Sequence, residues 1–277
     1  MTEVPPDAPQ PSPTAYTDAL ERNFADIQAH YARAVGGTVR DLDDVRMSAS
    51  GLPARVVNAV NRARFTPASA DERIAEAKAF FGGFGGSGVP FRWLVGPSSG
   101  PSDLPQRLHA AGIPRISDTP GMALDIGAMS DEAPNVPGLE VREVANAVEL
   151  EEWLGVSRAS ASFDDQVFAA WAAAHRALVW GPDAPLHNFV GRLEGRPVSV
   201  SALFTHDDVA GIWNVGTLDD VRGRGIGRET TLAALRLGRD LGYKTSILGS
   251  SPLGFPVYTR IGFVEVCRVR HFGPPIA

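Results

Sequence analysis

Val221-Arg222-Gly223-Arg224-Gly225-Ile226-Gly227 is the stretch that decides the fold of this 277-residue chain. It follows a short apolar run, residues 212–218, and opens an apolar pattern at helical spacing that continues to Tyr243. A strand, a glycine-rich turn and a helix present unpaired backbone N–H groups and the positive end of a helix dipole to an anion. Glycine suits such a turn because a Cβ would hold the anion away from the backbone. The stretch therefore predicts a phosphate-binding turn, flanked by two arginines.

The turn alone allows a second interpretation, a solvent-facing basic turn. It has neither the glycine spacing of a dinucleotide fingerprint nor the Gly-Lys-Ser/Thr ending of a nucleotide P-loop. A second motif follows in residues 246–263, where a strand-like run leads into Tyr258-Thr259-Arg260-Ile261-Gly262-Phe263. Together, the two motifs resemble the coenzyme A loop and the fifth strand and following helix of the GNAT acetyltransferase superfamily. Ser251, Gly254 and Val257 stand where that family usually has Asn, Ala and Leu.

The resemblance covers residues 139–272 well, and it implies an α/β fold. The expected sheet is of GNAT type, mixed and mostly antiparallel, and flanked by helices. The first half of the chain resembles a degenerate copy of the second: an offset of 150 residues places Gly112 on Gly262 and Leu108 on Tyr258. The alternative is that strand–turn–helix units often look alike. We therefore expect a second, degenerate GNAT-like domain before the catalytic one.

Four segments are predicted along the chain. The proline-rich start cannot hold a regular element, and an acidic, proline-containing stretch marks the domain boundary. The segments are a disordered leader (1–14), a degenerate GNAT-like N-terminal domain (15–130), a linker (131–138) and a catalytic GNAT N-acetyltransferase domain (139–277).

Local patterns predict the regular elements within these segments. In the first half they are a helix over 16–35, a hairpin of 45–50 and 54–60, a helix over 70–81, a strand over 91–95, a helix over 102–111 and a strand over 121–126. In the second half they are a strand over 139–144, helices over 147–154 and 163–173, a hairpin of 187–193 and 198–204, and a strand over 210–218.

Composition excludes several classes of protein. The formal net charge of −6, without a long basic run, argues against a nucleic-acid surface. Apolar runs are too short for a transmembrane helix, and the first residues lack the features of a signal peptide. Cys267 is the single cysteine, so no internal disulfide can form, and we interpret it as a small buried residue. A cytoplasmic protein is expected.

The resemblance implies acetyl-CoA as co-substrate, and we expect no metal. The pantetheine arm would pair like an extra strand in a slot between residues 210–218 and 246–251. Gly216 suits a close ligand approach, or alternatively marks a bulge. The residues expected to bind the coenzyme are Val215, Gly216, Thr217, Arg222, Gly223, Arg224, Gly225, Ile226, Gly227, Ser251 and Gly254.

Acyl transfer to an amine needs a neutral nitrogen and benefits from protonation of the departing thiolate. By resemblance, Tyr258 is the general acid; the alternative is a tyrosine that only packs. Many family members carry a carboxylate on the cofactor strand, but residues 209–218 contain none, and Asn214 cannot take a proton at neutral pH. His187, Asp164 and Asp165 are candidate bases, although a solvated surface role fits each of them, and none is assigned.

The predicted activity is transfer of an acetyl group from acetyl-CoA to a primary amine of a small molecule or peptide. The N-terminal half would form one wall of the acceptor cleft. The alternatives are a non-catalytic acyl-CoA-binding sensor and an acyltransferase that uses a different acyl chain. The acceptor and the choice between monomer and homodimer stay open.

Overall fold

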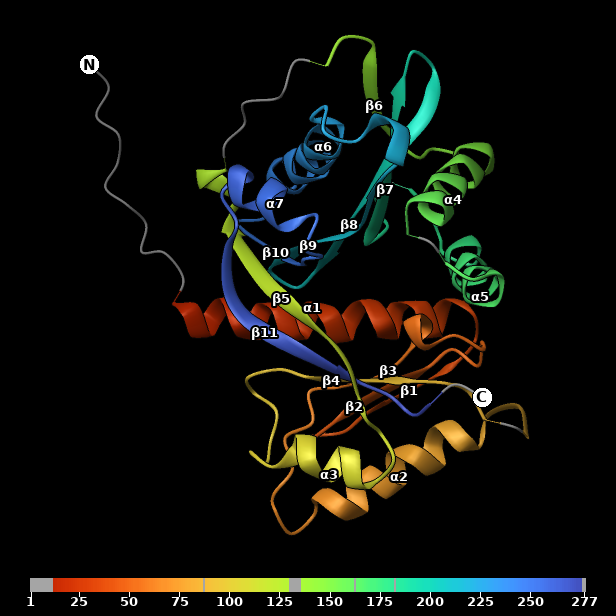
Figure 1. Cartoon of the computed structure of the whole chain (residues 1–277), viewed down its shortest axis with the longest axis vertical. Coiled ribbons are helices and arrows are strands. Elements are labelled where there is room, and N and C mark those ends of the chain that lie inside the picture. Colours follow the sequence, from red (N-terminus) through yellow and green to blue (C-terminus); the bar gives the residue numbers. More distant parts are fainter. Residues whose placement is uncertain (1–11, 87, 130–135, 162, 182, 276–277) are drawn as a thin grey trace.

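The computed structural model describes residues 12–86, 88–129, 136–161, 163–181 and 183–275. Within these residues one eleven-stranded sheet runs through the molecule, and helices flank it (Figure 1). The strands are β1 (Thr38–Asp41), β2 (Arg46–Ala49), β3 (Asn58–Asn61), β4 (Arg92–Val95), β5 (Arg115–Asp125), β6 (Leu139–Glu143), β7 (Leu186–Leu193), β8 (Arg196–His206), β9 (Val209–Thr217), β10 (Thr245–Gly249) and β11 (Val264–Phe272).

The helices are spread over both halves of the chain. The α-helices are α1 (Pro13–Ala34), α2 (Ala70–Gly82), α3 (Leu104–Ala110), α4 (Ala147–Ala161), α5 (Asp165–Arg176), α6 (Ile226–Asp240) and α7 (Phe255–Ile261). The 3-10 helices are η1 (Arg55–Val57), η2 (Phe84–Gly86), η3 (Ile126–Ala128) and η4 (Asp219–Val221). No helix among the described residues combines the length and apolar character needed to cross a bilayer.

The strand order shows an internal symmetry. It reads β1-β2-β3-β4-β11-β5-β10-β9-β8-β7-β6, so β1 to β4 on one side correspond to β7 to β10 on the other. In the described part of the chain, β3–β4 and β9–β10 are the parallel pairs, and every other neighbouring pair is antiparallel. The predicted fold class, a mixed and mostly antiparallel sheet flanked by helices, is confirmed.

The centre of this symmetry lies between β5 and β11. Thr119 pairs with Val269, and these residues are 150 apart (269 minus 119), which is the offset of the sequence repeat. The register of the sheet thus follows the repeat. Each central strand also crosses into the other half, since β5 lies between β10 and β11 while β11 lies between β4 and β5.

This exchange bears on the predicted domain division. The sheet is continuous from one half to the other, and the division of the chain around 131–138 stays a prediction. Residues 1–11 of the predicted leader and 130–135, which include most of the predicted linker, lie outside the described residues. Helix α1 begins at Pro13, inside the predicted leader, because proline is tolerated in a first helical turn and Ser12 accepts a hydrogen bond from the Ala15 amide.

Most predicted elements are present, with shifted ends. The predicted hairpin of residues 45–60 forms as antiparallel β2 and β3, but residues 55–57 adopt a 3-10 turn instead of a strand. Strand β5 begins at Arg115, six residues before the predicted start at 121. Its first half is polar and partly exposed, so no apolar alternation announces it; pairing with β11 makes it a strand.

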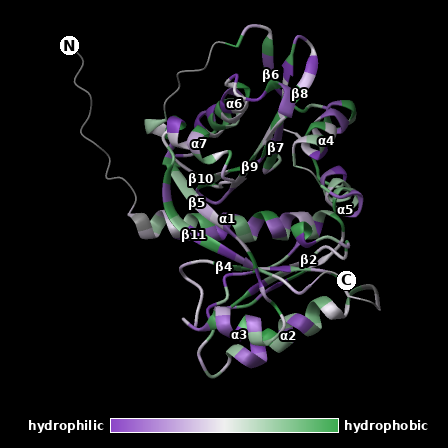
Figure 2. Cartoon of the chain, in the orientation of Figure 1, coloured by the Kyte–Doolittle hydropathy of each residue, from purple (hydrophilic) through white to green (hydrophobic). Residues whose placement is uncertain are grey.

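Helix α6 places the glycine-rich turn against the sheet. Its apolar residues recur on one side and pack on β7, β8 and β9, while polar residues occupy the other side (Figure 2). Leu232 and Leu235 are fully buried, and burial of such a side chain contributes about 1.5–3 kcal/mol. This packing fixes the position of the helix N-terminus.

Candidate active site

The glycine-rich turn leaves a row of amides without protein partners. Gly223 and Gly225 have φ values of +78° and +85°, a conformation that side chains with a Cβ rarely adopt. Within the described residues, no protein oxygen accepts a hydrogen bond from the amides of Gly223, Gly225, Ile226 or Gly227. The turn also forms the N-terminus of α6, where the helix dipole favours an anion. The turn is thus built to receive negatively charged oxygens.

Beside this turn, two parallel strands separate. β9 pairs with β10 through three residues, ending at Gly211 opposite Ile247, and residues 212–217 continue without a partner on that side. The β8 side stays paired around a bulge, in which Asn214 has φ of +51°. A bulge bends its strand and increases the local twist, which is consistent with the separation. The predicted slot between these strands is present.

The slot and the turn open into one space of about 650 Å³, which we call the cavity from here on. All eleven residues predicted to bind the coenzyme, and Tyr258, line it. The other lining residues, which were not among those expected to bind the coenzyme, are Ser160, Val221, Arg228, Leu253, Val257 and Arg260.

The lining of the cavity is basic. It includes four arginines and no carboxylate, although the whole chain carries a formal net charge of −6. Arg222 is held by the protein itself, since it donates to the Thr217 carbonyl at 3.0 Å and pairs with Asp219 at 2.7 Å. Arg224, Arg228 and Arg260 are the other arginines of the lining. Arg260 follows Tyr258 by two residues, but no periodic pattern marks it.

Tyr258 lies in the wall of the cavity with its phenol protonated. The residue is 7% exposed, and burial raises the pKa of its hydroxyl above the ordinary value of 10. Among the described residues, its hydroxyl has no hydrogen-bond partner, which leaves it able to donate to a ligand. A Cβ at Gly254 would lie 2.6 Å from the Tyr258 ring. Glycine therefore replaces the usual alanine because this ring occupies the space.

The structure favours a packing role for Gly216. A Cβ on this residue would overlap with the Ser160 hydroxyl of α4, so packing against a protein side chain accounts for glycine here. The bulge lies one to two residues earlier, between the pairs Val200–Gly216 and Ala202–Trp213. Ser251 is also partly used by the protein, since its hydroxyl accepts from the Gly254 amide at 3.1 Å.

The candidate bases lie elsewhere. His187 is buried on β7, where its Nδ1 lies 2.7 Å from a Glu143 oxygen. Asp164 caps the N-terminus of α5 by accepting from the Val167 amide, and Asp165 pairs with Arg158. None of the three lines the cavity. No base is assigned.

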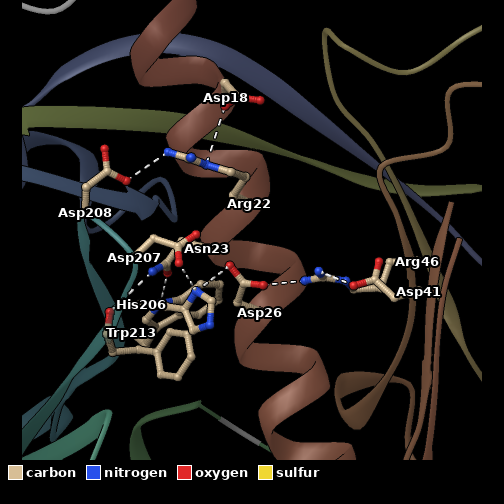
Figure 3. A network of polar contacts seen from close by, with 11 residues as sticks. Asp18, Arg22, Asn23, Asp26, Asp41, Arg46, His206, Asp207, Asp208 and Trp213 are labelled. Atoms are coloured by element: carbon tan, nitrogen blue, oxygen red, sulfur yellow. Dashed lines mark hydrogen bonds and ion pairs between the residues drawn. The ribbon is translucent and has the colours of Figure 1, made fainter. Parts of the chain in front are cut away.

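Two further groups of titratable residues lie outside the cavity. Asp26, His206 and Asp207 hold ligand-type atoms within 4.8 Å of one another, but Asp26 already pairs with Arg46 and His206 (Figure 3). Cys267 lies on β11, and burial raises the pKa of its thiol to about 11. A thiol so rarely deprotonated fits the predicted packing role and not a nucleophile.

Comparisons with known proteins agree with this geometry. Residues 148–263 match the family model described as the acetyltransferase (GNAT) family. No curated protein matches the sequence. A GCN5-related N-acetyltransferase from Kribbella flavida superposes with a TM-score of 0.72 at 19% identity, covering 94% of this chain and 96% of that one.

Two other solved structures share the fold. A GCN5-related N-acetyltransferase from Sphaerobacter thermophilus has a TM-score of 0.60 at 15% identity, covering 96% of both chains. A tandem GNAT protein from the clavulanic acid biosynthesis pathway has a TM-score of 0.55 at 12% identity, covering 94% of this chain and 97% of that one. The fold is thus shared over most of the chain, and residues 148–263 match the acetyltransferase domain of the GNAT family.

Proposed function

We propose that this protein is an acetyl-CoA-dependent N-acetyltransferase that acts on a primary amine of a small molecule or peptide. The observation that carries the proposal is the set of four unpaired amides of residues 223–227, which open into the same cavity as Tyr258. A pyrophosphate would satisfy these amides. Hydrogen bonds to a charged group contribute about 1.5–3 kcal/mol each. Four of them outweigh the helix-dipole contribution of about 0.3–1 kcal/mol.

The remaining residues of the cavity suit the rest of acetyl-CoA. On the side that β10 leaves open, the backbone of Val215, Gly216 and Thr217 can pair with the amides of a pantetheine arm, as an added strand would. The Thr217 carbonyl is already used, since it accepts from Arg222. Arg224 and Arg260 provide positive charge for phosphate groups. Acetyl-CoA would supply an acetyl group already activated as a thioester.

Tyr258 would act as the general acid. Its raised pKa keeps the phenol protonated at neutral pH, so the hydroxyl can donate a proton to a departing thiolate.

Calorimetric titration with acetyl-CoA tests the proposal directly. Gly227→Val places a branched side chain at the turn, where a Cβ would lie 2.9 Å from the Thr217 hydroxyl. We expect Kd to rise about 100-fold or more, which corresponds to about 2.7 kcal/mol. The control is Gly155→Val on the exposed side of α4, where a Cβ meets no atom within 4 Å. Equal affinities in the two variants would contradict the proposal.

One observation favours a second function, a sensor that binds acyl-CoA without turnover. No carboxylate lines the cavity among the described residues, so a general base has not been found there. Release of free thiol from acetyl-CoA in the presence of a panel of primary amines separates the two functions. A sensor binds acetyl-CoA with saturation and releases no thiol above the background rate. A panel of acyl-CoA esters of increasing length would in turn identify a different acyl chain.

A further inference from the structure

Helix α1 belongs to the first half of the chain but packs on both halves. Its 22 residues cross the sheet and contact β1, β2 and β3 as well as β8, β9 and β10 (Figure 1). No residue of α1 lines the cavity. The helix contacts β9 at the bulge, through Trp213 and Asn214.

The bulge turns two consecutive side chains of β9 toward α1. Residues alternate between the two sides of a regular strand, so Trp213 and Asn214 would normally point in opposite directions. Here both make hydrogen bonds with α1 side chains, because Asn214 adopts a left-handed conformation with φ of +51°. Asparagine tolerates this conformation better than most residues, but it stays in it only when neighbouring contacts hold it there.

Asn23 holds the first of these side chains. Its Oδ1 accepts from the Trp213 indole N–H at 3.0 Å, and its Nδ2 donates to the Phe204 carbonyl of β8 at 3.3 Å (Figure 3). The next residue, Phe24, lies at the point where the strands separate. Its ring centroid is 4.7 Å from that of Trp213 on β9, and a Cβ at Gly249 of β10 would lie 3.0 Å from its ring. Phe24 thus touches both diverging strands.

Tyr31 holds the second side chain through a hydrogen-bond chain of fixed direction. The Trp171 carbonyl can only accept, so His175 Nδ1, 2.9 Å away, carries a proton and donates it. In a neutral His175, Nε2 then carries no proton, and it accepts a hydrogen bond from the Tyr31 hydroxyl at 3.2 Å. The Tyr31 oxygen in turn accepts from Asn214 Nδ2 at 3.4 Å. The amide of Asn214 is therefore oriented by contacts that begin in α5.

We propose that α1 holds the slot open, with Asn23 and Tyr31 as positioning residues that fix Trp213 and Asn214 in the bulge of β9. The first half of the chain then sets the geometry of a binding site to which it contributes no lining residue. The inference rests on the proposed function where it concerns acetyl-CoA. Its effect on the strand itself can be measured without any ligand.

The test compares variants of α1 that remove contacts to the second half of the chain with a variant that removes contacts to the first half. Asn23→Leu removes the contacts to Trp213 and Phe204, and Tyr31→Phe removes the contact to Asn214. The matched control is Gln28→Leu on the same helix, because the buried Gln28 amide lies between the Val56 carbonyl at 3.1 Å and Arg92 at 2.7 Å, both in the first half. We expect acetyl-CoA Kd to rise about 10-fold in Asn23→Leu and less in Tyr31→Phe, and to stay within about twofold in Gln28→Leu.

Two readouts on the free protein separate this inference from the proposed function. Amide hydrogen exchange of residues 209–217 should become faster in Asn23→Leu and stay unchanged in Gln28→Leu. The indole N–H resonance of Trp213 should move upfield in Asn23→Leu, since its hydrogen bond is lost. If the wild-type protein does not bind acetyl-CoA, the proposed function fails, and these readouts still decide the inference. Equal exchange of residues 209–217 in both variants would overturn it, as would equal acetyl-CoA affinity. Tyr31→Phe, which removes one hydroxyl, serves if Asn23→Leu does not fold.

Discussion

The two halves of this protein contain the same strand order around a parallel pair, yet among the described residues only one half has a large cavity at that pair. β9 and β10 separate beside a cavity of about 650 Å³. β3 and β4 share two residue pairs, and the space beside them is about 10 Å³. The difference shows that the arrangement of strands is not sufficient to make a binding site.

A side chain of α1 fills the space in the first half. The Glu21 carboxylate lies so close to Gly96 that a Cβ there would overlap with it. It accepts hydrogen bonds from the amide of Ser98, at 3.1 Å, and from the Ser98 hydroxyl. The protein thus provides its own anion at the end of β4, the counterpart of β10, whereas the amides of the glycine-rich turn after β9 are left for a ligand. The same helix that closes the first site supports the second.

The largest effect is expected at Tyr258, because its counterpart in the first half has no hydroxyl group. Tyr258 corresponds to Leu108, which is fully buried in the core of the first half. Tyr258→Phe removes only the hydroxyl, so we expect acetyl-CoA Kd to be unchanged and kcat for amine acetylation to fall about 100-fold or more. Tyr243→Phe, which lies outside the cavity, is the control. An unchanged kcat would show that the Tyr258 hydroxyl takes no part in the reaction. The difference between Tyr258 and Leu108 would then have no catalytic role.

A second effect is expected in the way the free energy of unfolding depends on pH. Burial lowers the pKa of His175 to about 4, whereas an unfolded histidine titrates near 6.5. The unfolded state then binds more protons between these values, so the free energy of unfolding falls as the pH falls from 6.5 toward 4. This residue has little effect on the unfolding free energy above pH 7, and it should lower that free energy by about 2–3 kcal/mol between pH 7.5 and 4.5.

Urea unfolding at the two pH values measures this effect. His175→Gln should reduce the difference in unfolding free energy by about that amount. His271, which lies on β11 next to β4, has its pKa lowered to about 4 by burial and by Arg92, so His271→Gln is the comparison from the other half. A pH dependence that His175→Gln leaves unchanged would show that this histidine is not buried as a neutral group.

The smallest effect is expected at Glu21, whose side chain fills the space beside β3 and β4. Glu21→Ala removes the acceptor of the Ser98 amide, and we expect a loss of about 1–3 kcal/mol in unfolding free energy. The stoichiometry of acetyl-CoA binding should remain one per chain, because no glycine-rich turn follows β3, the counterpart of β9. Glu72→Ala on the exposed side of α2 is the control. A second molecule of acetyl-CoA bound by Glu21→Ala would mean that the Glu21 side chain alone prevents the first half from binding acetyl-CoA.

The sequence predicted the site better than it predicted its support. Residues 221–227 and 251–258 are local motifs, and local motifs keep their geometry when a strand, turn and helix follow each other directly. The contact of Asn23 with Trp213 spans 190 residues, and neither residue carries a pattern that indicates the other. The Ser160 contact at Gly216 was missed for the same reason. The start of β5 was missed because its polar residues become a strand only through pairing with β11.

The exchange of β5 and β11 has a consequence for truncated forms of the protein. A fragment of residues 139–277 would retain the acetyltransferase motifs but lose β5, the antiparallel neighbour of both β10 and β11. β10 would then have one bare backbone edge, and β11, which also loses β4, would be left without a neighbouring strand. Exposed edges recruit other strands, so such a fragment is expected to self-associate or aggregate.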